Sequence, residues 1–128
     1  MPRLKADKKN TINKVDVSQT AIDAMLRKNA DDVTVLNIEH VPNTLFDKFI
    51  ICTANSGIQA ETISDEIIYS IRNEFKIKPI NIEGTENKEW ILLDYFDVLI
   101  HIFLPETRTF FKLEQLWADA EIKKISID

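Results

Sequence analysis

The sequence is poor in glycine and cysteine, and it has no long apolar run. Two glycines among 128 residues exclude a glycine-rich phosphate-binding loop, and a single cysteine, Cys52, excludes an internal disulfide. No apolar stretch approaches the about 20 residues that a membrane-spanning helix needs. Residues 1–10 are basic and polar, without the apolar segment of a secretory signal. We therefore expect a cytoplasmic protein that does not contact a membrane.

What is present indicates one globular domain with an acidic body. A chain of this length builds a single core of moderate size, and 45% hydrophobic and 29% charged residues are ordinary for such a domain. Residues 1–15 carry a net charge of +4, whereas the rest of the chain, with 11 basic and 20 acidic side chains, carries −9. An acidic body disfavours general nucleic-acid binding, which depends on lysine and arginine, and it favours a basic partner. On charge alone, a surface that only keeps the protein soluble is an equal alternative.

We expect three regions along the chain. Residues 1–15 lack apolar periodicity and are predicted to form a flexible basic arm. Residues 16–118 contain the apolar patterns of the folded domain. Residues 119–128 alternate isoleucine with polar residues, so this tail either adds a strand or lies disordered.

The first half of the domain is predicted to contain two helices and two strands. Asp16 and Gln19 resemble a capping box in front of an apolar stripe with helical spacing. Residues 32–38 are β-branched and predict a strand. Residues 47–54 contain four adjacent apolar side chains, which predicts a central strand buried on both faces. A polar Asn-Ser-Gly cap then precedes a helix over 58–75.

Three further strands are predicted after this helix. Residues 80–82 form a short strand, parallel to the strand at 47–54 if the connection is the usual right-handed crossover. Residues 89–95 and 97–103 follow as two strands joined by almost no loop. The expected fold is a two-layer α/β (α+β) domain with a mixed sheet of about five strands and with helices packed mainly on one face.

A last helix is predicted after Pro105, over about residues 106–118. Its apolar residues recur at helical spacing, so Phe110, Leu113 and Trp117 should form one buried stripe. Arg108 and Phe111, three positions apart, lie together on the flank of this stripe.

Two pairs of side chains raise the question of catalysis. Asp94 and Asp97 could hold Mg²⁺ for phosphoryl or nucleotidyl transfer, but residues three apart on a strand point to opposite faces. Cys52 and His101 lie on strands that are expected neighbours, but no orienting third group accompanies them, and with His40 they show no metal-ligand spacing. We favour structural roles, in which Asp97 holds the turn and Asp94 accepts hydrogen bonds at an interface. Cys52 is then a small buried residue, and His101 hydrogen-bonds within the sheet or at its edge.

The strand at 89–95 contains a tryptophan, Trp90, whose position bears more directly on function than these pairs do. Alternation divides its side chains between the two faces of the sheet, as Trp90, Leu92 and Asp94 against Ile91, Leu93 and Tyr95. Only one face of a two-layer domain is fully covered by helices, so the face that carries Trp90 is the better candidate for a partner-binding surface. Tryptophan, tyrosine and arginine dominate interface energetics. The alternatives are that Trp90 is a core residue and that Arg108 and Phe111 form a solvated helix flank.

Several short sequence elements follow one another in a characteristic order and spacing. They are Glu83-Gly84, Trp90–Asp94, Asp97–His101 and Arg108–Trp117, with Phe49–Ser56 upstream. In this pattern the chain resembles the ribosomal silencing factor (Iojap-like) family over about residues 18–117. Two positions depart from the family pattern, because Ala54 replaces a glycine and Phe111 replaces a tyrosine. Phe111 therefore lacks any hydrogen bond that a hydroxyl would make there.

The resemblance implies a non-enzymatic translational repressor with a nucleotidyltransferase-like topology, no cofactor and no metal. Such a protein docks on the large ribosomal subunit at its intersubunit face, mainly against ribosomal protein number fourteen. There it blocks joining of the small subunit when nutrients are limiting. The partner-binding residues implied by the matching positions are Trp90, Leu92, Asp94, Tyr95, Arg108 and Phe111.

Two other functions remain open from the sequence. The alternative from another class is a small metal-dependent nucleotidyl- or phosphotransferase that uses Asp94 and Asp97. A third possibility is a homo-oligomeric scaffold whose Trp90 surface pairs with itself, which would make the free protein a homodimer. In the ribosomal interpretation, the basic arm at residues 1–15 is expected to contact ribosomal RNA.

Overall fold

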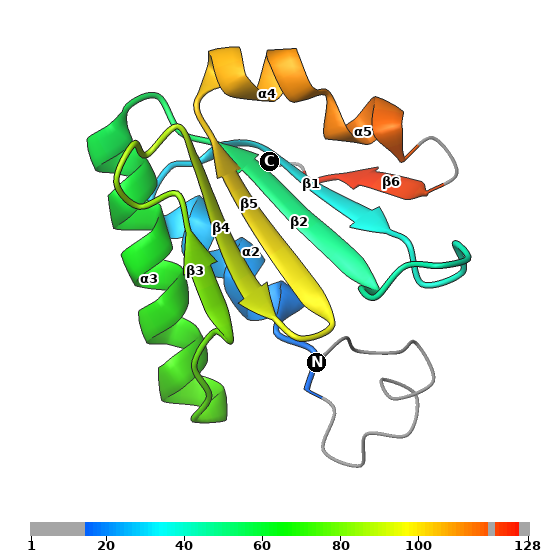
Figure 1. Ribbon diagram of the computed structural model, residues 1–128. Coiled ribbons are helices and arrows are strands. Elements are labelled where there is room, and N and C mark those ends of the chain that lie inside the picture. Colours follow the sequence, from blue (N-terminus) through cyan, green and yellow to red (C-terminus); the bar gives the residue numbers. More distant parts are fainter. Residues whose placement is uncertain (1–14, 118–119, 126–128) are drawn as a thin grey trace.

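The computed structural model describes residues 15–117 and 120–125. Its elements follow one another as α2 (Ser18–Arg27), β1 (Asp31–Asn37), β2 (Lys48–Thr53), α3 (Gly57–Phe75), β3 (Asn81–Glu83), β4 (Trp90–Tyr95), β5 (Val98–Phe103), α4 (Pro105–Phe111), α5 (Leu113–Leu116) and β6 (Glu121–Lys124) (Figure 1). Within the described residues, six strands form one mixed sheet in the order β3-β4-β5-β2-β1-β6. The mixed α+β fold is confirmed, and part of the predicted tail supplies the additional strand, β6. The arm at residues 1–14 lies outside the described residues, so its flexibility stays a prediction.

β2 lies at the centre of the sheet, as its apolar run predicts. It pairs in parallel with β5 and antiparallel with β1, and its residues from Phe49 to Thr53 are all buried. A strand with neighbours on both edges and layers on both faces has no exposed side, so successive apolar residues are the only pattern that suits it. β2 and β5 therefore form the rigid centre on which the other elements pack.

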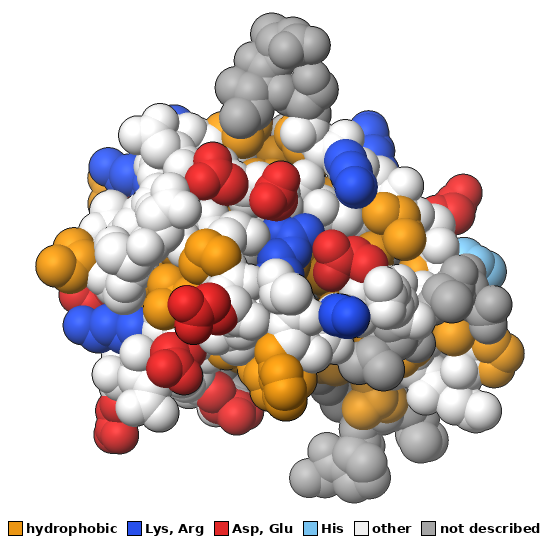
Figure 2. Space-filling model, turned by 90° about the horizontal axis from the view of Figure 1, so that it is seen from above, with side chains coloured by type: hydrophobic (Ala, Val, Ile, Leu, Met, Phe, Trp, Pro, Cys, Tyr) orange, Lys and Arg blue, Asp and Glu red, His pale blue; other side chains and the backbone are white. Residues whose placement is uncertain are grey.

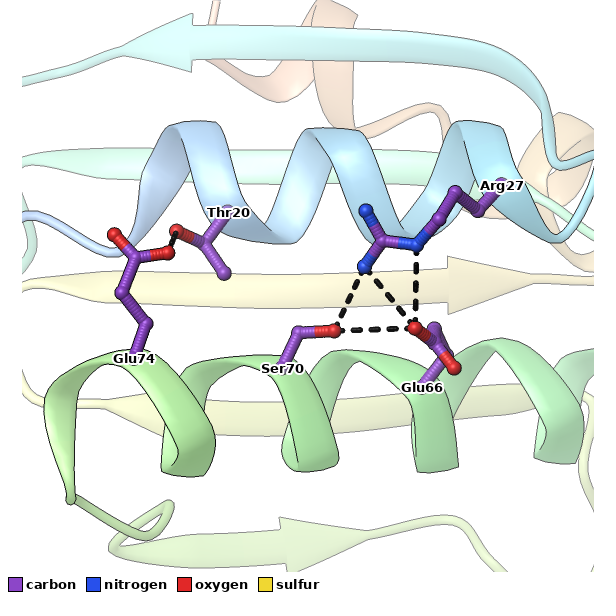
Figure 3. Close-up of polar contacts among 5 residues, drawn as sticks. All are labelled: Thr20, Arg27, Glu66, Ser70 and Glu74. Atoms are coloured by element: carbon purple, nitrogen blue, oxygen red, sulfur yellow. Dashed lines mark hydrogen bonds and ion pairs between the residues drawn. The ribbon is translucent and has the colours of Figure 1, made fainter.

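α2 and α3 lie antiparallel on one face of the sheet, here called the helix-covered face (Figures 1 and 3). The side chains of α3 that face the sheet recur at spacings of three and four, and Ala60, Ile63, Ile67 and Ile71 are completely buried. α3 begins as expected, because Ser56 accepts a hydrogen bond from the backbone of Gln59.

Polar contacts join the two helices along their solvent-exposed edge. The Arg27 guanidinium donates to Glu66 and Ser70, and the Thr20 hydroxyl donates to Glu74 (Figure 3). Arg27 is exposed over 52% of its side chain, so the ion pair to Glu66 is expected to contribute less than about 1 kcal/mol.

The capping box predicted for α2 does not form. Val17 occupies the N-cap and makes no side-chain cap. Asp16, one residue earlier, accepts a hydrogen bond from the Ser18 amide, while Gln19 bonds forward to Asp23 along the helix. The two side chains therefore find local partners other than each other.

β3 is an edge strand. It pairs antiparallel with β4, which pairs antiparallel with β5, which is parallel to β2. The strand therefore runs in the same direction as β2, as predicted, but two strands separate them. Each residue of β3 is exposed, which agrees with a short strand that has the sheet on one side only.

The predicted last helix is wrong in its continuity and in its buried stripe. Lys112 adopts a left-handed conformation (φ 48°) and separates α4 from α5. Phe110 is 77% exposed, whereas Leu113 is buried and Trp117 packs against the second face of the sheet. The break rotates α5 relative to α4, so the residues no longer share one face.

The second face of the sheet is only partly covered. Its core joins β1, β2 and β5 to α5 through seven buried residues, Leu36, Ile38, Phe49, Ile51, Leu99, Phe103 and Leu113. Trp90 and Leu92 pack at the border of this cluster. Helices therefore lie mainly on one face, and the second face ends in a partly open surface along β4.

Candidate partner-binding surface

Alternation along β4 places its side chains as the sequence predicts. Ile91, Leu93 and Tyr95 are buried, and Trp90, Leu92 and Asp94 are partly exposed. The Trp90 surface is defined here as Trp90, Leu92 and Asp94 of β4 together with Phe111 of α4. Figure 2 looks down on the α4 end of the molecule, where apolar side chains are interspersed with acidic and basic ones.

The Trp90 ring contacts two phenylalanine rings. Its ring lies 4.8 Å from that of Phe103, with an interplanar angle of 30°, and 4.7 Å from that of Phe111. Phe111 is 40% exposed, and its neighbour Phe110 is 77% exposed. The indole is therefore held by one stacked and one tilted ring contact, and its partly exposed surface is available to a partner. The exposure of Phe110 could not be predicted from the sequence, because helical spacing places this residue in the buried stripe.

The polar atom of Trp90 is already bonded. Its indole N–H donates to Nδ1 of His101, over 3.0 Å, so the His101 proton resides on Nε2. His101 is 2% exposed, and burial lowers its pKa to about 3. A neutral histidine of this kind holds the orientation of Trp90. The prediction that His101 forms a hydrogen bond within the sheet is confirmed.

Gly84 of the Glu83-Gly84 element is required by a close approach of two backbone segments. It has a φ of +82°, and a Cβ atom there would overlap the carbonyl oxygen of Trp90. Any other residue would therefore displace the segment that leads into β4. The sequence alone gives no sign of this contact, because it joins residues that are six positions apart.

Both aspartates take part in the turn between β4 and β5, because the Asp97 amide donates to the Tyr95 carbonyl and the Asp94 side chain also holds the turn. One Asp94 carboxylate oxygen accepts a hydrogen bond from the Phe96 amide, and Phe96 takes a left-handed φ of 72°. Asp97 is 4% exposed, and its carbonyl accepts from the amides of Asp47 and Lys48 at the start of β2. Asp94 thus fixes the shape of the hairpin that carries the Trp90 surface, and Asp97 ties that hairpin to the central strand.

Arg108 is a clamp between α4 and the ends of β1 and β2. Its guanidinium donates to the Asp32 carbonyl, to the hydroxyls of Thr53 and Thr34, and to the Glu114 carboxylate. Only 12% of the side chain is exposed, at the floor of a cleft of about 840 Å³ beside β1. The structure therefore separates Arg108 from Phe111, although the two are three residues apart.

Tyr95 also lies apart from the Trp90 surface. It is 4% exposed, on the helix-covered face, and its hydroxyl has no hydrogen-bond partner among the described residues. Burial raises its pKa above the usual range. Direct contact with a partner would require it to leave this core, so we place it among the residues that support the surface.

The side chains considered for catalysis do not come together. Cys52 pairs with Ile102 and packs in the helix-covered core, whereas His101 faces the other side of the sheet. Burial raises the pKa of the Cys52 thiol to about 12, so it is not a thiolate at neutral pH. No cluster of three or more histidine, cysteine, aspartate or glutamate side chains in the described part of the chain could hold a metal ion.

The sequence matches the model of the family described as "Ribosomal silencing factor during starvation" over residues 11–128. The chain belongs to the ribosomal silencing factor family. The ribosomal silencing factor RsfS of Halalkalibacterium halodurans is 34% identical over 105 residues, which cover 82% of this chain and 88% of that protein. RsfS of Bacillus subtilis is 32% identical over 111 residues, which cover 87% and 92%.

Solved structures share the fold of this silencing factor domain. A crystal structure from Chromobacterium violaceum superposes with a TM-score of 0.75 at 27% identity, covering 80% of this chain and 83% of that chain. One from Bacillus halodurans gives 0.70 at 32% identity, covering 87% and 97%. The mouse "Mitochondrial assembly of ribosomal large subunit protein 1" is 28% identical over 102 residues, 75% of this chain and 42% of its own length. In the described part of this family member, no helix is long and apolar enough to cross a membrane.

Proposed function

We propose that the chain is a cytoplasmic translational repressor that binds the large ribosomal subunit at its intersubunit face. Bound there, its bulk blocks joining of the small subunit, especially under nutrient limitation. The observation that carries this proposal is the Trp90 surface, displayed on a rigid hairpin in a member of the silencing factor family. The name of the mouse relative, which refers to the large ribosomal subunit, supports the choice of subunit. A steric mechanism needs affinity and bulk without bond chemistry, so the proposed protein is not an enzyme.

The proposed partner at the docking site is ribosomal protein number fourteen, with contacts to ribosomal RNA from the basic arm. The body of the chain carries −9, which complements a basic partner. Trp90 and Phe111 would supply ring edges, Leu92 apolar area and Asp94 an acceptor. Arg108 and Tyr95 would act indirectly, by holding α4 and β4 in place. When no ribosome is present, the same surface is a candidate for a homodimer.

Co-sedimentation tests the proposal directly. Pure protein mixed with isolated large subunits is expected to pellet with them through a sucrose cushion, and not with isolated small subunits. Equal recovery with both subunits, or with neither, would contradict the proposal. A reassociation assay then measures whether added protein lowers the yield of joined ribosomes.

Truncation of Trp90 is expected to weaken docking and also to lower stability. Trp90→Ala should weaken binding to large subunits by about 2 kcal/mol or more, the range of interface anchors. The same change removes the packing of the indole on Phe103 and Phe111. We therefore also expect a loss of unfolding free energy of about 2 kcal/mol. Binding is therefore measured at a temperature where circular dichroism shows the variant to be folded.

The matched control is Ile58→Ala, which removes an apolar side chain that is 77% exposed on α3. It should leave both subunit binding and unfolding free energy within about 0.5 kcal/mol of the original. A Trp90 variant that is fully folded and binds as tightly as the control would show that the surface lies elsewhere.

A further inference from the structure

A concave basic surface lies at the C-terminal end of α3. The basic groove, as we name it, has a volume of about 460 Å³ and is lined by Tyr69, Arg72, Asn73, Lys76 and Lys78. It gathers three of the 11 basic side chains found after residue 15, in a body that carries −9. Such a local concentration of positive charge requires an explanation.

The cations of the groove are available for a ligand. Arg72 and Lys78 form no ion pair and no side-chain hydrogen bond with the described residues, and both are exposed. By contrast, Arg27, Lys48, Lys88 and Arg108 are each paired with a carboxylate. The groove therefore contains two exposed cations that no carboxylate of the described residues neutralises.

The acidic residue nearest in sequence is directed elsewhere. Glu74 accepts a hydrogen bond from Thr20 on α2 (Figure 3), and the Lys76 ammonium donates to the Asn73 carbonyl. The groove consequently keeps its positive charge, although it adjoins an acidic side chain.

An exposed aromatic ring completes the groove. Tyr69 is 66% exposed and lies three residues before Arg72, so the two share one side of α3. Cations at a helix C-terminus stabilise the helix dipole, which accounts for Arg72 and Lys76. The helix dipole does not account for Lys78, which lies beyond the end of α3. It also does not account for the exposed ring of Tyr69.

The groove lies at the end of the molecule where α2 begins. α2 begins at this end, as the Thr20–Glu74 hydrogen bond shows, and in the sequence the +4 segment of residues 1–15 precedes α2. The Asp94 end of β4 is adjacent, because the amide of Ile80 donates to the Asp94 carbonyl. A polyanion in the groove would therefore lie close to the start of α2 and to one end of the Trp90 surface.

We infer that the basic groove binds single-stranded RNA. Arg72 and Lys78 pair with phosphates of the backbone, and the Tyr69 ring stacks on an unpaired base, the combination that single-stranded nucleic acids require. The inference deepens the proposed function and rests on it for the source of the RNA, which is ribosomal. The binding itself needs no ribosome and is tested without one.

The test measures fluorescence anisotropy of a labelled twelve-nucleotide RNA of mixed sequence with the full chain. Arg72→Gln/Lys78→Gln should weaken binding at least about fivefold at low salt and lower the slope of log affinity against log salt by about 1.4, for two phosphates. The matched control is Lys123→Gln/Lys124→Gln, which removes two exposed cations of β6 and should change affinity less than about twofold. Tyr69→Ala should weaken binding about tenfold without changing the salt slope.

The outcomes are separate from those of the docking proposal. Losses confined to the groove pair and to Tyr69→Ala support the inference. Equal losses in the groove pair and the control pair, or no loss in Tyr69→Ala, overturn it. Tighter binding to labelled polyglutamate than to RNA also overturns it, in favour of an acidic protein partner. The Trp90 docking result is read on large subunits, so it can fail while RNA binding holds, and the reverse.

Discussion

Arg108→Ala is expected to lower the free energy of unfolding by about 3 kcal/mol, although it removes a residue from the rim of the fold. The change leaves the Glu114 carboxylate and two threonine hydroxyls without their charged donor, in a site where only 12% of the arginine side chain is exposed. Loss of one partner from a shielded ionic network typically costs about 3 kcal/mol. The described residues 105–111 of α4 are all at least partly exposed, so few other contacts hold this helix.

Arg27→Ala is the matched control for this prediction. It makes the same substitution at an arginine that also bonds a glutamate and a hydroxyl, but at a site exposed over 52% of the side chain. Its expected effect is below about 1 kcal/mol. Urea denaturation of both variants, followed by circular dichroism, gives the comparison. Similar losses in the two variants would show that Arg108 is not a clamp, and that α4 is held by the packing of Phe111 on Trp90.

Acidification from pH 6.5 to pH 4 is expected to lower the free energy of unfolding by about 3 kcal/mol through His101 alone. The unfolded histidine has a pKa near 6.5, whereas burial lowers the folded pKa to about 3. Between these values the unfolded state binds a proton that the folded state does not bind, so stability falls as the pH falls. The loss begins below pH 6.5 and approaches about 1.4 kcal/mol per pH unit.

His101→Asn isolates this contribution from that of the carboxylates. The asparagine carbonyl stands close to the position of Nδ1, so it can accept the Trp90 N–H, but it does not titrate. The difference in unfolding free energy between the two proteins, measured by urea denaturation at a series of pH values, should follow the histidine curve. In the same series, the Trp90 indole N–H resonance should keep its hydrogen-bonded shift in the variant. Parallel pH profiles for the two proteins would mean that His101 is already protonated, or accessible, in the folded state.

Much of this fold can be predicted from local patterns of apolar and polar residues in the sequence. The apolar run from Phe49 to Cys52 predicts the central strand, and the alternation from Trp90 to Tyr95 predicts which side chains face which layer. Both predictions depend only on which side chains are buried, and the order of apolar and polar residues within one short segment indicates this. The position of Trp90 at the border of a partly covered face follows from the same alternation.

What the sequence does not reveal depends on contacts between distant residues or on unfavourable backbone conformations. Lys112 carries no signal for the left-handed conformation that breaks the last helix, since a glycine would be the usual sign. Arg108 finds its partners on β1 and β2, more than fifty residues away along the chain. The hydrogen bond from Trp90 to His101 requires the register of β4 against β5, which no local pattern specifies.

The pairing of β1 with β6 has a consequence for how the chain is made. β1 ends at Asn37, and the strand that covers its outer edge begins at Glu121. At about 5–20 residues per second, β1 is synthesised roughly 4 to 17 s before β6. During that interval the growing chain carries an unpaired strand edge of the kind that joins other chains. The outer edge of β1 in the nascent protein therefore remains open to such pairing until β6 emerges.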